Sequence, residues 1–231
     1  MEIIAQHSTL FYVMALASGL CVCWGMGANN VANAMGTSVG SGAITVRQAL
    51  ILAAVMGFAG AYLAGGEVAA TVSKGIIDGK LFESVPHLLL FAMIGALLAA
   101  GIWLTVASMR GWPVSATHSI VGAVCGAGVA ALGIDAVNWE MMAEIVVSWC
   151  ISPVLGGIVA LVLTLSIRKL IFNTENPIRQ ARRWGPMYAF LVGWIVALVT
   201  TTTGLKHVNI NLGGVEGQVL AIAIGIVLAI I

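Results

Sequence analysis

The sequence predicts an all-α protein that crosses a membrane several times, and three observations lead to this prediction. Of the 231 residues, 60% are hydrophobic and 8% are charged, whereas soluble domains carry about 25% charged residues. Long apolar runs follow one another along the chain, and a membrane-spanning helix needs about 20 such residues. Two polar, glycine-rich stretches, 27–43 and 111–128, interrupt these runs. Because lipid cannot satisfy their hydrogen bonds, we expect broken or re-entrant helices there, buried in protein or lining a water-filled cavity.

The apolar runs define a single transmembrane domain, 1–231. We expect six full spans, at 10–26, 48–66, 88–109, 114–134, 145–167 and 187–203. Pro153 predicts a kink in the fifth span, because proline removes a helical hydrogen bond. A further run, 218–231, is shorter than a span. We interpret it as a truncated seventh helix, so that 187–231 is the start of further spans.

The longest polar stretch, 168–185, sets the expected orientation. It holds five cationic residues: Arg168, Lys169, Arg179, Arg182 and Arg183. By the positive-inside rule this segment is a cytoplasmic loop, and counting spans back from it puts the N-terminus outside. Residues 1–9 contain no Lys or Arg, unlike the start of a signal peptide, so the first run is expected to remain as a helix.

The four cysteines, at positions 21, 23, 125 and 150, all lie in apolar runs. They form no CxxC motif and no Cys/His cluster with the spacing of a metal site. We therefore expect small buried hydrophobic residues and no cofactor. The net charge of +1 gives no indication of a nucleic-acid partner.

Glycines at four-residue spacing suggest where helices pack closely. Gly36 and Gly40 form one GxxxG pair, and Gly122 and Gly126 form another. Because such pairs let helix backbones approach in membranes, we expect close contacts at both.

The first polar stretch, GANNVANAMGTSVGSGA at 27–43, contains a row of candidate cation ligands. Asn29 and Asn33 are four residues apart and share a face in a helix, which Thr37 continues. Amide and hydroxyl oxygens are hard, neutral ligands that suit sodium, and broken helices of transporters supply such oxygens. The alternative is a hydrogen-bond cluster that only joins helices.

The second polar stretch begins GWPVSATHS, and it has the composition of an anion site. We expect Pro113 in the first turn of a helix, with Ser115, Thr117 and His118 in that turn or just beyond. A helix N-terminus binds anions through free N–H groups and its dipole, and an imidazole adds a donor. The alternative is ordinary capping with a packed histidine. Ser115 and His118 are too close for a catalytic dyad and no GxSxG motif is present, so we do not expect an enzyme.

Both stretches resemble the signatures of the inorganic phosphate transporter (PiT) family. LAGGEVAATVSKGIID at 63–78 and TENPIRQARRWGPMYAF at 174–190 are similar to its bacterial members. The resemblance implies a secondary transporter in the bacterial inner membrane, multi-pass and surrounded by lipid, that moves inorganic phosphate with sodium or protons. It implies two halves related as an inverted repeat, with the site between them. The residues expected to face phosphate are Asn30, Ser115, Thr117 and His118, and those expected to hold the cation are Asn29, Asn33 and Thr37, with sodium at Asn29 and Asn33.

Three departures from the family pattern leave alternatives open. One signature copy is present where the family has two, so a second transporter half or a homodimer partner is expected. Asn30 stands where the family motif has Asp, and Gly57 stands where relatives have Glu. Intramembrane carboxylates are costly and usually functional. The alternatives are therefore an inactive or regulatory half-transporter, or a permease for a related anion such as sulfate.

Overall fold

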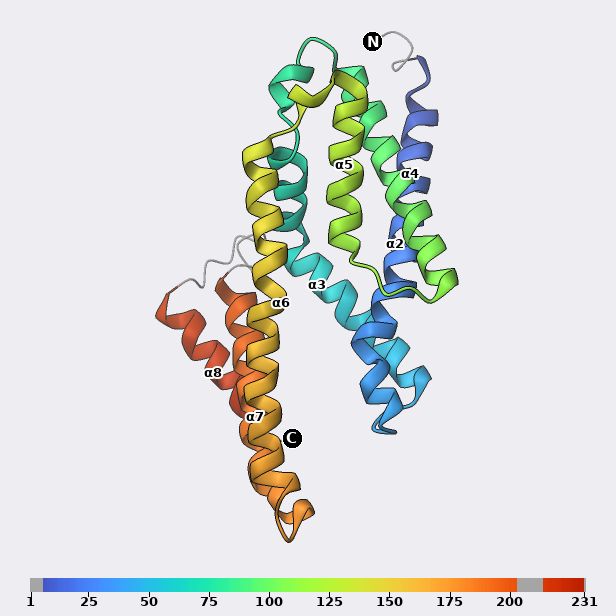
Figure 1. The fold of residues 1–231 in the computed structure, drawn as a ribbon. Coiled ribbons are helices and arrows are strands. Elements are labelled where there is room, and N and C mark those ends of the chain that lie inside the picture. The colour runs from blue at the N-terminus through green and yellow to red at the C-terminus, as the bar shows by residue number, and fades with distance from the viewer. Residues whose placement is uncertain (1–5, 203–213, 231) are drawn as a thin grey trace. The chain divides into compact units, whose positions relative to one another are not determined.

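Over the described residues, the regular structure is helical apart from one isolated antiparallel bridge between Ile77 and Val137 (Figure 1). The computed structural model describes residues 6–202 and 214–230, without the side chains of 63, 64 and 66–74. The α-helices are α2 (Ser8–Gly40), α3 (Val46–Gly75), α4 (Pro86–Arg110), α5 (Ala116–Leu132), α6 (Trp139–Ile167), α7 (Pro177–Thr202) and α8 (Val215–Ile230). The shorter elements are two 3-10 turns, η1 (Gly79–Phe82) and η2 (Ile134–Ala136), and the π-helical turn η3 (Arg168–Phe172).

Every expected apolar run falls largely within a helix, but the helices differ in length. Among the helices that the structure describes, four are long and apolar enough to cross a membrane: Ser8–Gly40, Pro86–Met109, Trp139–Phe172 and Pro177–Thr202. Over the described residues, the apolar helices Val46–Tyr62, Ala116–Leu132 and Val215–Ile230 are shorter. The count of six full spans, the truncated seventh and the inverted repeat remain predictions. Residues 203 and 231, at the ends of two expected spans, lie outside the described residues.

Within the first polar stretch, 27–43, the expected break comes only at its end, because α2 runs without interruption from Ser8 to Gly40. Its 33 residues extend about 50 Å at 1.5 Å each. The asparagines stay helical because Asn30 and Asn33 are exposed and Asn29 bonds to the 112–114 backbone, so none of these amides competes for the backbone bonds of α2. The turn comes later, where Gly42 has a φ of 75° and Thr45 opens α3 with a capping box to Gln48.

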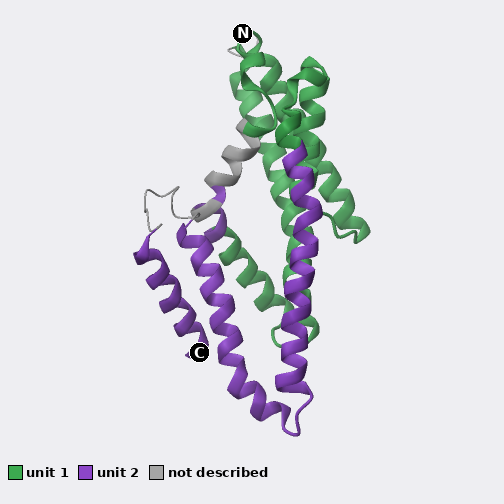
Figure 2. Cartoon of the chain, turned by 60° about the vertical axis from the view of Figure 1, so that its left-hand side comes forward, with its two compact units in different colours: residues 1–58, 69–142 green, residues 59–68, 143–231 purple. Residues whose placement is uncertain are grey.

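The contacts divide the chain into two compact units (Figure 2). The first unit comprises residues 1–58 and 69–142, and its core joins α2, α4 and α5. Val22, Ala100, Leu104 and Ala116 are buried together there. The face of α2 that packs on α4 carries small or polar residues, because Ser18, Gly25 and Asn29 are buried on it with Val22.

The close contacts between α2 and α4 use glycines other than the GxxxG pairs. A Cβ placed at Gly25 would lie 2.8 Å from Leu104 Cβ, and one at Gly101 would lie 2.9 Å from Cys21 Sγ. A Cβ placed at any of the four glycines of the predicted pairs meets no atom of the described residues within 4 Å. The prediction of close packing at those pairs is therefore wrong within the described part of the chain.

The second unit comprises residues 59–68 and 143–231. The helix α6 continues past Pro153 as far as Ile167 and ends in η3. The expected cytoplasmic loop 168–185 is largely helical, because α7 begins at Pro177 and proline suits the first helical position. The helices α7 and α8 pack through small residues, and Thr201 Oγ1 donates to Gly217 O at 3.4 Å.

Candidate substrate site at the turn between α4 and α5

A left-handed glycine separates α4 from the second polar stretch. Gly111 has φ 66° and ψ 25°, and the N–H groups of Gly111 and Trp112 bond to the carbonyls of Ser108 and Ala107. This is the Schellman arrangement, which satisfies the last carbonyls of a helix. Residues 112–115 are then non-helical, and α5 begins at Ala116. Pro113 therefore lies before the helix, not in its first turn as expected.

The side chain of Asn29 joins the two polar stretches. Its Nδ2 donates to Trp112 O at 2.8 Å, and its Oδ1 accepts from Val114 N at 3.2 Å. Asn29 is 6% exposed, so neither partner is easily replaced by water. The amide thus pairs with the 112–114 backbone as another peptide group would. A hydrogen-bond cluster that joins helices was one of the two interpretations that the sequence left open for Asn29.

Ser115 is the N-cap of α5. Its Oγ accepts from His118 N at 3.2 Å, and its carbonyl accepts from Ser119 N and from Ser119 Oγ. The Ser115 hydroxyl keeps its own hydrogen for donation to another group. Ser115, Thr117 and His118 all have exposed side chains at this end of the helix. The expected helix N-terminus is therefore present, and its capping serine is the residue also predicted to face an anion.

A cavity of about 200 Å³ lies where α2 meets the turn. It is lined by Ala28, Asn29, Ala32, Asn33, Ser108, Gly111, Trp112 and Pro113. Two of the predicted cation ligands, Asn29 and Asn33, therefore share one cavity with the second polar stretch. Asn30, Thr37, Ser115, Thr117 and His118 are not among its lining residues.

Ser108 is a polar residue of this cavity that the sequence interpretation missed. Its Oγ bonds to Leu104 O at 2.7 Å and lies 3.4 Å from Gly25 O. It sits three residues before Gly111, inside an apolar run. Gly111 predicts the end of the helix, so a serine in the last turn before it was a sequence signal for a polar group next to the turn.

Three predicted site residues of α2 lie on the exposed side of the helix, and one of them, Asn33, also lines the cavity. Asn30, Asn33 and Thr37 are spaced i, i+3 and i+7 and are exposed. At about 100° per residue they fall on one face, next to the buried face that carries Asn29. One stripe of α2 therefore presents three amides and a hydroxyl within three turns.

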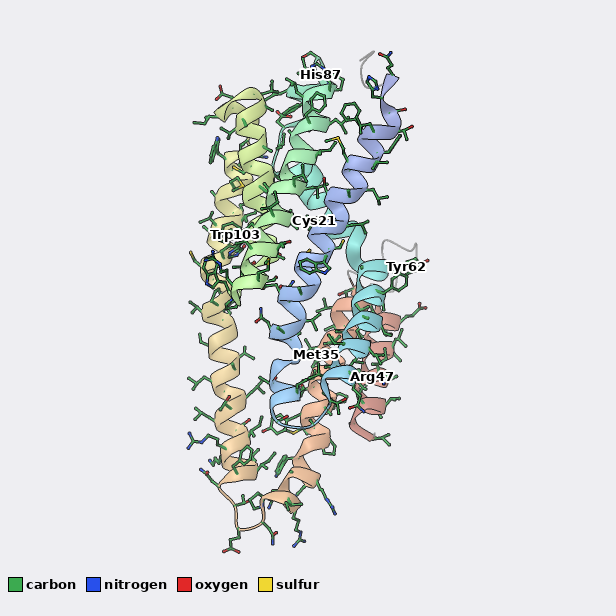
Figure 3. The ribbon with its side chains drawn as sticks, turned by 90° about the vertical axis from the view of Figure 1, so that its right-hand side faces the viewer. Cys21, Met35, Arg47, Tyr62, His87 and Trp103 are labelled. Atoms are coloured by element: carbon green, nitrogen blue, oxygen red, sulfur yellow. The ribbon has the colours of Figure 1, made fainter. Side chains whose placement is uncertain are left out.

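Aromatic rings flank the turn. The rings of Trp103 and Trp112 have centroids 6.2 Å apart, and Trp103 lies on α4 (Figure 3). The guanidinium carbon of Arg110 lies 5.5 Å from the centroid of the Trp112 ring, within the range of a cation–π contact. The turn is therefore held by side-chain contacts to α4 as well as by Asn29.

Comparisons with known proteins identify relatives over nearly the whole chain. A Haemophilus influenzae protein named "Putative phosphate permease" is 42% identical over 227 residues, covering 98% of this chain and 54% of that protein. An Arabidopsis thaliana protein named "Inorganic phosphate transporter 2-1, chloroplastic" is 44% identical over 188 residues, covering 81% of this chain and 32% of that protein.

One solved structure, named "The sodium-dependent phosphate transporter", has a TM-score of 0.85 at 36% identity and covers 96% of this chain and 54% of that chain. The chain thus spans about half the length of the curated relatives it matches. A family model described as "Phosphate transporter family" matches residues 26–228, a range that includes both polar stretches. The chain is accordingly a multi-pass membrane protein that belongs to the phosphate transporter family.

Proposed function

We propose that the chain supplies one half of a secondary transporter that carries inorganic phosphate together with sodium. The observation that carries this proposal is a pair of hydrogen bonds, one donated by Asn29 to Trp112 O and one accepted by Asn29 from Val114 N. They hold the row of amides on α2 beside the turn that leads into α5. Asn29 and Asn33 thereby line one cavity with Gly111, Trp112 and Pro113, and the same turn leads to the N-terminus of α5.

The anion half of the proposed site is the start of α5. The first N–H groups of a helix lack partners within it, and the dipole favours negative charge there. Ser115 and Thr117 add hydroxyl donors, and His118 adds an imidazole in the same turn. We assign phosphate to these residues and to Asn30 on α2. Neutral donors bind an anion without a fixed positive charge, which also favours its release.

The cation half is the stripe on α2. Asn33 and Thr37 offer uncharged oxygens, and Asn29 Oδ1 keeps a second lone pair beyond its bond to Val114. An amide cannot gain or lose a proton near neutral pH, so this stripe suits sodium better than proton coupling. The similar solved structure is itself named as sodium-dependent.

The proposed transporter needs a second half. Secondary transporters place their sites between structural repeats and move one repeat against the other. The relatives are about twice the length of this chain, which is the length that a second repeat requires. A separate polypeptide or a second copy of the chain can fill the same place.

Uptake of radiolabelled phosphate into cells that lack phosphate carriers tests the proposal. The chain is expressed alone and together with the C-terminal half of the Haemophilus influenzae relative, and sodium and pH are varied independently. We expect sodium-dependent uptake when both halves are present. Thr117→Val should raise the KM for phosphate, and Asn33→Leu should weaken the dependence on sodium. Unchanged values in these variants would remove both assignments.

Asn30 and Gly57 favour one further possibility, an inactive or regulatory half. Both stand where the resembling family has carboxylates, and Gly57 lies in α3 where an added Cβ meets no described atom within 4 Å. Uptake that appears only after Asn30→Asp and Gly57→Glu would identify a disabled site.

Sulfate that competes better than phosphate for uptake would identify a sulfate permease.

A further inference from the structure

We propose that the end of the α6–α7 hairpin, residues 168–183, binds the anionic headgroups of membrane phospholipids. This segment, here called the basic hairpin end, contains half of the ten Lys and Arg residues of the chain and one carboxylate, Glu175. The five cationic side chains are exposed. Nitrogen-tipped side chains gather around the connection between the two helices (Figure 3).

The cations come from both helices of the hairpin. Arg168 and Lys169 lie in η3, which continues α6. Three more lie in the first two turns of α7, where Arg179, Arg182 and Arg183 are spaced i, i+3 and i+4 and share one face. The connection between η3 and α7 is only residues 173–176. The fold therefore brings two separate groups of cations to one end of the hairpin.

The neighbouring residues indicate the height of these charges relative to the bilayer. Both Trp139–Phe172 and Pro177–Thr202 are candidate membrane spans. Next to the charges lie Trp184 and Tyr188, residues that typically sit at the headgroup level. Tyr188 Oη bonds to Ser166 Oγ at 2.7 Å, and the Arg183 guanidinium lies 5.7 Å from the Trp184 ring centroid. The aromatic pair thus separates the apolar part of the hairpin from its cations.

A phospholipid fits this surface better than a free anion. The cations are spread over an exposed helix end and do not converge on one buried point, so a small ion would remain largely hydrated. A lipid phosphate is held at the same height by its own acyl chains. In a cluster of four to eight Lys and Arg next to a spanning helix, each cation raises the affinity for anionic lipid by about fivefold. Arginine also forms bidentate bonds with phosphate oxygens. This lipid site is independent of the transported substrate.

Lipid selectivity measured at the protein surface tests the proposal. The purified chain is reconstituted in phosphatidylcholine vesicles with spin-labelled phosphatidylglycerol or phosphatidylcholine, and the immobilised fraction of each label is compared. We expect the anionic label to be enriched, and R179Q/R182Q/R183Q to reduce that enrichment by about fivefold or more. R179K/R182K/R183K should retain most of it. The control R47Q/K80Q removes two cations elsewhere in the chain and should leave the enrichment unchanged.

Three results would overturn the assignment. The first is equal immobilisation of both labels by the unaltered chain. The second is an equal loss of enrichment in R47Q/K80Q, because net charge alone would then explain the effect. The third is displacement of the anionic label by free inorganic phosphate at constant ionic strength, which would identify a site for soluble anions. Circular dichroism of each variant verifies that the helices are intact.

Discussion

Asn29 and Trp112 lie 83 residues apart in the chain and are joined by a 2.8 Å hydrogen bond from the Asn29 amide to the Trp112 carbonyl. The same amide accepts from the backbone of Val114. A side chain of α2 therefore fixes the conformation of a turn that belongs to two other helices. This relationship makes the two polar stretches of the sequence a single structural element.

Asn29→Asp separates a joining role from a cation-binding role. An ionised aspartate cannot donate, so its oxygen would face the Trp112 carbonyl and destabilise the chain by about 1–3 kcal/mol. The repelled turn moves away from the carboxylate and Val114 N thereby loses its acceptor, so we expect faster hydrogen–deuterium exchange at the Val114 amide and a lower midpoint of thermal unfolding. Asn33→Asp, the same change one turn later at an exposed position, is the control and should leave that exchange unchanged. If Asn29 acted only as a cation ligand, the carboxylate would instead strengthen sodium binding and leave the turn protected.

Gly25→Ala should destabilise the packing of α2 on α4. The new methyl group would lie 2.8 Å from Leu104 Cβ and 3.3 Å from the backbone nitrogen of Thr105, so the helices must move apart. Overpacking of this kind costs about 1–3 kcal/mol. The control is Gly19→Ala on the same helix, where a Cβ meets no described atom within 4 Å. It should be neutral or stabilise by up to about 1 kcal/mol. Equal thermal unfolding midpoints for the two variants would contradict the observed contact.

Substitutions at Ser115 should separate helix capping from anion binding. Ser115→Ala removes the acceptor for His118 N and is expected to cost about 0.5–2 kcal/mol. Ser115→Asp restores the cap and suits the helix dipole, so its stability should match the unaltered chain. Its negative charge would nevertheless repel phosphate. We therefore expect Ser115→Asp to unfold normally in a thermal melt and to lose phosphate uptake in cells. Normal uptake by this variant would exclude the start of α5 as the phosphate site.

Tyr188→Phe should weaken the contact between α6 and α7. The change removes the hydroxyl that bonds to Ser166 Oγ at 2.7 Å and keeps the ring. Hydrogen bonds between membrane helices contribute about 0.6 kcal/mol on average, so a small fall in the unfolding midpoint is expected. The control is Tyr12→Phe, because the Tyr12 side chain is 76% exposed. A similar fall in both variants would show that the Ser166 contact contributes nothing specific.

Much of the fold follows from apolar length, but helix ends do not. Each expected apolar run falls largely within a helix, because burial or lipid contact requires the backbone to pair internally. The polarity of 27–43 predicted a break, and the helix does end inside this stretch, but only after Gly40, so its three asparagines are all helical. Thr45 and Gln48 form the capping box that begins α3. The spacing of these two residues was a sequence signal for that helix start.

The residues of the candidate site could be predicted from the sequence, but their hydrogen-bond partners could not. The two polar stretches were identified from their residues, and Asn29 and Asn33 do line one cavity. The partners of Asn29 are backbone groups of Trp112 and Val114. Because nearly every residue has the same backbone groups, residue types do not indicate which of them bind a side chain. The burial of Ser18, Gly25 and Asn29 on one face of α2 depends on helical phase, which the spacing of small residues could have indicated.

The long separation between Asn29 and its partners sets an order for assembly during synthesis. Chains grow at about 5–20 residues per second, so roughly 4–17 s pass between the synthesis of Asn29 and that of Trp112. During that interval α2 must hold an amide whose final partners do not yet exist. The helix α2 is therefore synthesised before the partners of Asn29 exist. Asn29 reaches its final hydrogen bonds only when the turn between α4 and α5 has been synthesised and has folded against it.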